Sequence, residues 1–304
     1  MDWTTTGLLA SIRRRASIPT TATTGGLDAD LLAFANEELR LGLVSKLLTL
    51  RESYFKRDSD STIAAATTSY RIPTRAVGGK LASVRLLDSA GGELGVLTEV
   101  PDERLEDYSG LSSTAAYRVL GNSLVLVPSA VTSAVTLRQT YFAQPSELVA
   151  SGYATISAIN TSTNVVTTSA IHGYTTSSVL DLVRASEGFE SLAIDQTPTA
   201  VGSTTTLTFS SLPSGLAVGD YVCVFRQSPV PQIPSEFHPI LAQRVACAYL
   251  EAQGAPELAA AVKKLEAMEE AIGILSSPRV DSGSKKIINR FSPLGVSGAR
   301  RWGV

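Results

Sequence analysis

The side chains that could carry out chemistry are few and widely separated. The chain has two histidines, His172 and His238, and two cysteines, Cys223 and Cys247, with each cysteine inside an apolar run. These residues lack the spacing of a zinc site, and the sequence contains neither a Gly-x-Ser-x-Gly elbow nor a phosphate-binding loop. We therefore expect no enzyme activity, no cofactor and no metal site, and we expect both cysteines to be reduced core residues.

Two weaker patterns have simpler structural explanations. The stretch from Val77 to Leu81 combines two glycines with a lysine, but it lacks the Walker spacing, so it predicts a loop between strands. The acidic residues between Pro101 and Asp107 could hold a cation or form an acid–base pair. A solvated helical turn is the favoured explanation and needs no ligand.

Three consecutive arginines, Arg13, Arg14 and Arg15, end a helix that we expect over residues 4–17. Cations at this position complement the helix dipole, so a solvated helix end explains them. The alternative is a contact with DNA phosphates or with an acidic partner. The net charge of −2 and the pI near 5.8 give no global argument for nucleic acid, so such a contact would be local.

Residues 278–304 combine basic and large apolar side chains without helical or strand periodicity. A segment that is merely disordered rarely contains so many large apolar groups. The pattern predicts an arm that docks on another chain, and the alternative is an arm that folds back on its own domain. The predicted partner-binding residues are Lys285, Lys286, Ile287, Ile288, Arg290, Phe291, Leu294, Arg300, Arg301 and Trp302.

Helical periodicity appears in two distant parts of the chain. Apolar residues recur at steps of three and four from Asp28 to about Arg57. The same pattern in residues 235–276 predicts two antiparallel helices, because Gly254 and Pro256 mark a helix end and a helix start. We place these helices in one small bundle that is discontinuous in the sequence.

The stretch between the helices is rich in strand signals. Tyr70 to Pro73 predicts an edge strand, and two hairpins follow across Asp88–Gly92 and Gly121-Asn122. From Gly152 onward the sequence repeats itself at an offset of 42 residues, with Ala158 on Ala200. Each copy predicts three strands, and the pair predicts a small barrel or sandwich with approximate twofold symmetry.

Together these patterns predict an α+β protein with five parts. They are an N-terminal short helix and linker (1–26), a helical bundle (27–60 and 234–277), a β-hairpin region (61–149), a duplicated β-insert (150–233) and a C-terminal docking arm (278–304). No apolar run approaches the roughly 20 residues that span a bilayer, and the first residues lack a signal-peptide pattern. We therefore expect no membrane contact.

With this organisation the chain resembles the head-to-tail adaptor proteins of tailed bacteriophages, which are also called head-completion or connector proteins. Four stretches carry the resemblance, and the duplicated insert lies outside them. They are Leu27-Asp-Ala-Asp-Leu-Leu-Ala-Phe-Ala-Asn-Glu-Glu-Leu, Ser69-Tyr-Arg-Ile-Pro-Thr-Arg-Ala-Val-Gly-Gly-Lys-Leu, Pro231-Gln-Ile-Pro-Ser-Glu-Phe-His-Pro-Ile-Leu-Ala and Ser277-Pro-Arg-Val-Asp.

The resemblance implies a virion structural protein of the phage neck, assembled in the host cytoplasm. Twelve copies would form a homo-oligomeric ring under the portal protein, with the arm on the portal and the other face toward the tail or next neck protein. Double-stranded DNA would pass through the lumen without specific contacts.

Two alternatives remain open at this point. A tail-completion or terminator ring protein would bind the tail tube in place of the portal. A carbohydrate-binding or adhesion module would use aromatic residues of the insert to stack on sugars, with Tyr153, Tyr174, Phe189 and Tyr221 as the candidates.

Overall fold

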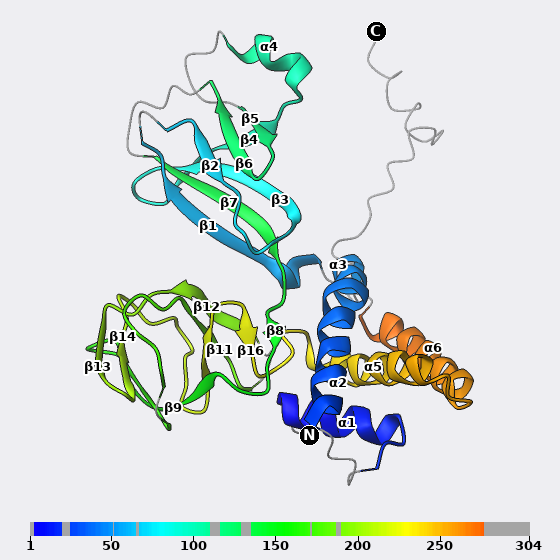
Figure 1. The fold of residues 1–304 in the computed structure, drawn as a ribbon. Coiled ribbons are helices and arrows are strands. Elements are labelled where there is room, and N and C mark those ends of the chain that lie inside the picture. The colour runs from blue at the N-terminus through cyan, green and yellow to red at the C-terminus, as the bar shows by residue number, and fades with distance from the viewer. Residues whose placement is uncertain are drawn as a thin grey trace, which may run out of the picture.

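The structure, a computed structural model, describes residues 3–19, 25–50, 52–64, 67–109, 116–128, 135–170, 172–186 and 190–276. It is an α+β protein, as the sequence predicts (Figure 1). Helices form one part, and two separate β regions form the others. Within the described ranges, no helix is both long and apolar enough to cross a lipid bilayer.

The helices share one hydrophobic core, and we call this group the helical body. It consists of α1 (Thr5–Arg15), α2 (Gly25–Glu37), α3 (Val44–Leu50), α5 (His238–Gln253) and α6 (Leu258–Ser276), with a π-helical segment, η1 (Glu38–Leu43), between α2 and α3. α5 lies in the middle and packs against α1, α2 and α6. Its Leu241 is fully buried with Leu8 of α1 and Leu31 of α2. Segments more than 200 residues apart in the sequence therefore form one packed unit.

The long early helix ends sooner than the sequence predicts. It stops at Leu50, a 3₁₀ turn follows (η2, Glu52–Phe55), and β1 (Lys56–Thr62) begins where we expected helix. The expectation of helix to about Arg57 is therefore wrong. Asp58, Ser59 and Asp60 are weak helix formers, and this segment instead pairs antiparallel with β7 (Thr136–Ala143).

Both ends of α5 follow the expected chemistry, whereas α6 begins at Leu258, two residues after the expected start at Pro256. Pro239 lies in the first turn of α5, where its missing N–H would have no partner. Gly254 ends α5 in the left-handed conformation, with φ of 62°, and its N–H donates to the Glu251 carbonyl. The predicted role of Gly254 as the end of this helix is confirmed.

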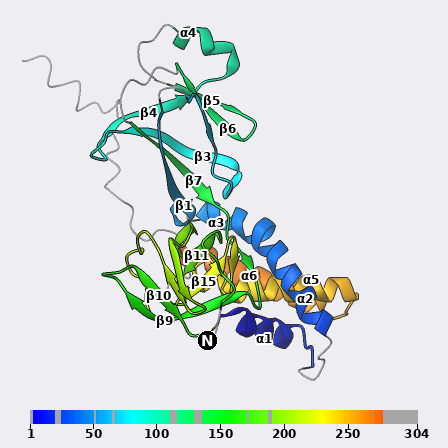
Figure 2. The same ribbon diagram turned by 60° about the vertical axis from the view of Figure 1, so that its left-hand side comes forward.

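The first β region is a seven-stranded sheet with strand order β1-β7-β3-β4-β5-β6-β2. Its remaining strands are β2 (Ser69–Arg71), β3 (Ala76–Leu87), β4 (Glu93–Glu99), β5 (Ala116–Leu120) and β6 (Ser123–Val127). β3–β4 and β5–β6 are the two predicted hairpins, and β2 is the predicted edge strand. The acidic segment after β4 forms η3 (Asp102–Arg104) and α4 (Leu105–Ser109), as expected for a helical turn. Figures 1 and 2 both show this region projecting from the end of the helical body near α3.

The stretch from Val77 to Leu81 is not a loop, because it lies inside β3. Gly78 and Gly79 have φ of 59° and 69°, and the pairing with β7 shifts register between Ala76 and Leu81. Positive φ is easiest for glycine, so the two glycines form a bulge within a continuous strand. The sequence-based interpretation of these glycines as a loop signal is corrected accordingly.

The second β region is another seven-stranded sheet, with strand order β12-β11-β15-β9-β10-β14-β13. Its strands are β9 (Tyr153–Asn160), β10 (Val165–Thr168), β11 (Leu180–Val183), β12 (Ser191–Gln196), β13 (Ala200–Ser203), β14 (Thr206–Thr208) and β15 (Tyr221–Val224). Two short parallel strands, β8 (Glu147–Leu148) and β16 (Gln227–Ser228), lie where the chain enters and leaves the region. β12 is an additional strand that we did not predict.

Strand pairing in this region follows the sequence offset of 42 residues. Where β11 pairs with β15, Asp181 lies opposite Cys223, which is its own counterpart at that offset. The same offset places Leu180 on Val222 and Leu182 on Val224, so it maps the pair Leu180–Val224 onto the pair Leu182–Val222. The two sequence copies therefore meet across an approximate local twofold axis at this strand pair.

Candidate functional site

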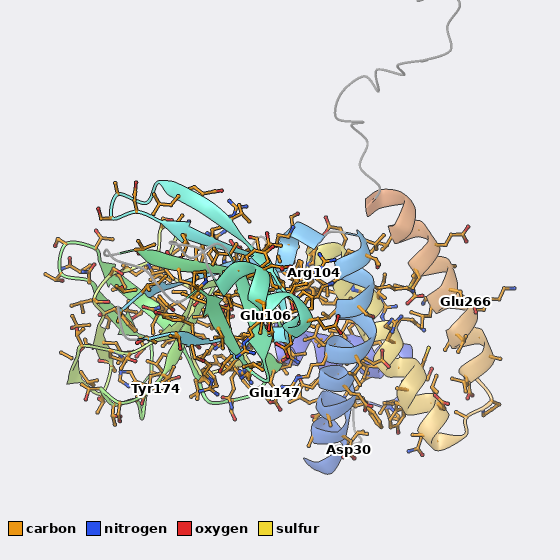
Figure 3. All side chains as sticks on the ribbon, turned by 90° about the horizontal axis from the view of Figure 1, so that it is seen from above. Asp30, Arg104, Glu106, Glu147, Tyr174 and Glu266 are labelled. Carbon is orange, nitrogen blue, oxygen red and sulfur yellow. The ribbon has the colours of Figure 1, made fainter. Side chains whose placement is uncertain are left out.

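The ten predicted partner-binding residues between Lys285 and Trp302 lie outside the described residues, so their role remains a prediction. The structure does describe the helix that leads to them. α6 ends at Ser276, and it packs on α5 along one side. Figure 3 shows Glu266 on the outer side of α6, at the edge of the molecule. The surfaces near this helix end are therefore candidates for a docking site.

The arginine run of α1 is largely used inside the molecule. Arg13 forms an ion pair with Asp28 of α2, with 2.6 Å between Nη2 and Oδ1. Arg15 donates from Nη1 to Oε1 of Gln243 in α5 at 2.9 Å, and burial lowers its pKa. Arg14 is exposed. The contact with DNA or an acidic partner remains a prediction, and of the three side chains only Arg14 lies open to it.

A partly buried charge network joins four elements of the helical body. Arg244 of α5 donates to Glu38 of η1 at 3.0 Å and to Glu269 of α6 at 2.5 Å, and Lys46 also pairs with Glu269. Burial opposes ionisation of Glu269, but the hydrogen bonds and charges of Lys46 and Arg244 hold its pKa below the ordinary value. A side chain at Gly42 would collide with the Arg244 guanidinium, so glycine leaves the space for this contact.

An apolar pocket of 270 Å³ lies between α3, α5 and α6, next to this network. Leu43, Ile240 and Ile272 are buried around it. Gly273, which also lines the pocket, lies in the last turn of α6 before the undescribed C-terminal segment. The pocket therefore combines apolar walls with a charged rim at the base of the predicted arm.

A second charge network, more deeply buried than the first, fixes the two β regions to each other. Arg75, which lies between β2 and β3, donates from Nη2 to both carboxylate oxygens of Asp181 at 2.8 and 2.7 Å. Its Nε donates to Asp195 at 3.0 Å, and its guanidinium lies 4.9 Å from the centre of the Phe225 ring. Asp181 also accepts the backbone N–H of Arg226. Arg75 and Asp181 are buried, so this contact holds the second β region in one orientation.

The sequence did not reveal these two networks. The partners of Arg75 are 106 and 120 residues away, and those of Arg244 are 25 and 206 residues away. Long-range pairing leaves no periodic signal in a single sequence. One indirect signal exists, because Arg75 belongs to the Ser69–Leu81 stretch that carries the resemblance to phage adaptors.

Both histidines and both cysteines are buried and contact other residues of the protein. His238 is buried against Trp3, its Nε2 lies 3.1 Å from the Ile233 carbonyl oxygen, and burial lowers its pKa to about 4. His172 stacks on Tyr174, and burial lowers its pKa as well. Both cysteines are buried thiols. Among the described residues there is no group of three or more His, Cys, Asp or Glu side chains that could hold a metal ion.

The described tyrosines proposed as sugar-stacking groups are engaged with the protein itself. Tyr153 and Tyr221 pack edge to face on each other, with ring centres 5.3 Å apart. The Tyr174 hydroxyl donates to the carbonyl oxygens of Gly152 and Val222, both at 3.1 Å. Phe189 lies outside the described residues. These contacts account for the tyrosines without a sugar ligand.

The fold and these contacts define an α+β protein with a helical body and two β regions that are fixed to each other. A family model described as SU10 adaptor protein matches residues 3–172. Because the match covers more than half of the chain, the protein belongs to this family, which is a family of bacteriophage adaptor proteins. Comparison with curated proteins gives no match.

The extent of the match differs from the expected common part. It includes the stretches that begin at Leu27 and Ser69, but it ends before those that begin at Pro231 and Ser277. It also continues into β9 and β10 of the second β region, which we expected to lie wholly outside the common part. The first copy of the duplicated segment is therefore partly family sequence.

Proposed function

We propose that this protein is a structural adaptor of a phage neck, which forms a ring of twelve copies under the portal and joins the DNA-filled head to the tail. Membership of the adaptor family over residues 3–172 is the observation that carries the proposal. The protein would be a virion component assembled in the host cytoplasm. It would bind the portal and the tail or next neck protein, let double-stranded DNA pass through the lumen, and act without catalysis, metal or cofactor.

In this proposal the helical body is the unit that repeats around the ring. It corresponds to the discontinuous bundle that we inferred from the sequence. The exposure of α6 supports this role, because α5 covers it along one side and Val262 is 37% exposed on another. A helix packed on one side only is suited to contact a neighbouring subunit. The second β region, a duplicated barrel-like insert, would then decorate the outside of the ring.

The arm is the proposed portal contact. Its apolar residues Ile287, Ile288, Phe291 and Trp302 would enter pockets on the portal, with its lysines and arginines around them. A segment that orders on docking loses conformational entropy, which keeps the affinity of a single arm modest. Repetition around a ring multiplies that weak contact, so binding and ring closure would occur together.

The test is the mass of the purified protein, alone and mixed with its portal, by native mass spectrometry. We expect a monomer alone and a defined ring on the portal. A variant that lacks Lys285–Val304 should stay a folded monomer and fail to join the portal, because it lacks the proposed anchors. A second variant with the same arm residues in scrambled order is the control for composition.

Each outcome decides between the candidate functions. Loss of portal binding in both arm variants supports the adaptor, whereas full binding without the arm contradicts the proposed contact. A stable ring that ignores the portal and binds the tail tube would favour the terminator instead. A monomer indifferent to both would reopen the adhesion-module hypothesis, which binding of residues 152–226 to a glycan array would then support.

A further inference from the structure

The apolar pocket beside α3, α5 and α6 lies where the C-terminal segment begins. Its volume is 270 Å³, and a cavity of about 150 Å³ lined by apolar side chains is enough to bind benzene. The pocket therefore has room for a phenylalanine ring or for branched aliphatic side chains. Phe237 and Leu50 add to the apolar wall formed by Leu43, Ile240 and Ile272.

The end of α6 next to this pocket is acidic. From Leu265 to Ser276 the helix contains Glu266, Glu269 and Glu270 but no lysine or arginine. The C-terminal end of a helix dipole is itself negative, so nearby cations are favoured there. Glu269 is already paired with Lys46 and Arg244, whereas Glu266 and Glu270 are exposed. Glu266 lies one turn before Glu269 of the pocket rim and Glu270 follows it directly, so this end of α6 favours a basic segment.

The C-terminal segment and the rest of the chain also carry net charges of opposite sign. Of the 26 basic and 28 acidic side chains, residues 277–304 carry six basic and one acidic, which leaves 20 basic and 27 acidic in residues 1–276. The segment has a net charge of +5 and the rest of the chain has −7. The segment that follows α6 is thus opposite in charge to the body from which it extends.

We propose that the pocket between α3, α5 and α6 holds residues 285–294 of the same chain when the protein is free. Ile288 and Phe291 enter the pocket, while Lys285, Lys286 and Arg290 lie near Glu266 and Glu270. The chain from Ser276 to Ile288 is long enough to return, since a dozen extended residues span up to about 40 Å. The tether also gives the segment an effective concentration in the millimolar range, which favours its own pocket over that of another copy.

Binding in the pocket would keep the apolar side chains of the arm out of solvent until a partner with higher affinity displaces the arm from the pocket. If the arm also binds the portal, as proposed above, the portal must compete with this pocket, and that last step alone rests on the proposed function. Occupation of the pocket in the free protein does not depend on the portal.

Photo-crosslinking in the full-length protein tests the proposal. The photoreactive residue p-benzoylphenylalanine is introduced at Thr49, an exposed residue that lines the pocket. The matched control places it at Ala33 of α2, which is also exposed and lines a different, larger groove of 620 Å³. Each protein is irradiated as a monomer without portal, and the crosslinked peptides are mapped by mass spectrometry. A mixture of isotope-labelled and unlabelled protein separates crosslinks within a chain from those between chains.

We expect Thr49 to crosslink to residues 285–294 of the same chain, and Ala33 not to do so. The double variant Ile288→Ser/Phe291→Ser should reduce the Thr49 crosslink severalfold, because both anchors are then polar. The proposal is overturned if Thr49 yields no crosslink to the segment, if Ala33 yields it equally, or if the crosslinks join different chains. Portal binding is measured separately, so failure of the adaptor function would leave the crosslinking result standing, and the reverse also holds.

Discussion

Arg75 is the side chain on which the placement of the second β region depends most directly. It is 3% exposed and bonded to Asp181, which is itself fully buried. Arg75→Met would leave that carboxylate buried without its cation, and removing one partner of a buried pair costs about 3–5 kcal/mol. We expect a loss of this size in the free energy of unfolding, measured by urea denaturation.

Arg138→Met is the matched control. Arg138 pairs with Asp60 at 2.7 Å in similar geometry, but both side chains are more than a third exposed. Exposed pairs contribute about 0–1 kcal/mol, since water and salt screen them. Equal losses in the two variants would show that Arg75 is no more important than a surface arginine.

His238 makes stability depend on pH in a defined window. Burial lowers its pKa from 6.5 to about 4, so between these values the unfolded chain binds a proton that the folded chain does not. Stability is therefore full above about pH 6.5 and falls toward pH 4, by roughly 3 kcal/mol if this histidine acts alone. His238→Gln should flatten that part of the profile of unfolding free energy against pH. An unchanged slope in the variant would assign the acid sensitivity to carboxyl groups instead.

Residue-scale chemistry could be predicted only where it is local. The end of α5 at Gly254 and the placement of Pro239 follow from the residues themselves, because each acts on its own backbone. The buried partners of Arg75 and Arg244 could not be predicted, since a single sequence contains no record of which distant carboxylate meets a given arginine. The proposed arm residues stay predictions, because they lie outside the described structure.

At the scale of elements, helices and strands were predicted wrongly where the spacing of apolar residues gave no signal. The hairpins were predicted because turn residues and alternation agree, and both are local signals. β1 was missed because Lys56–Thr62 is polar throughout and becomes a strand only by pairing with β7. The glycines of β3 were misread because a bulge and a loop share the same residue preference.

The repeat shows what a long-range sequence signal can supply. An offset of 42 residues indicated two related copies, and the same offset relates the strand pairs around Asp181 and Cys223. The sequence did not show that equivalent residues of the two copies make different contacts. Asp181 holds Arg75 of the first β region, whereas its counterpart Cys223 is buried against Val183 and Val230. The two copies therefore contribute different groups to the contact with Arg75: a carboxylate from the first copy and the Phe225 ring from the second.

At the scale of the whole molecule, the sequence could predict the α+β class but not the mutual orientation of the parts. That orientation is set by contacts between distant segments, such as the N–H of Thr5 donating to the Pro229 carbonyl at 2.7 Å. Family membership adds the biological setting for residues 3–172. It leaves α5, α6 and the arm as the parts on which assembly has to be tested directly.

Ring formation through α6 gives the clearest such test. Val262→Glu places a charge on the exposed side of α6, where the proposed neighbouring subunit would bury it, so the variant should stay a folded monomer but fail to form a ring on the portal. Its stability should change by less than about 0.5 kcal/mol, because the site is exposed in the monomer. Val218→Glu is the control, since Val218 is 64% exposed in the second β region, outside the proposed contact. Native mass spectrometry with portal distinguishes the two, and a normal ring from Val262→Glu would show that α6 faces solvent in the assembly.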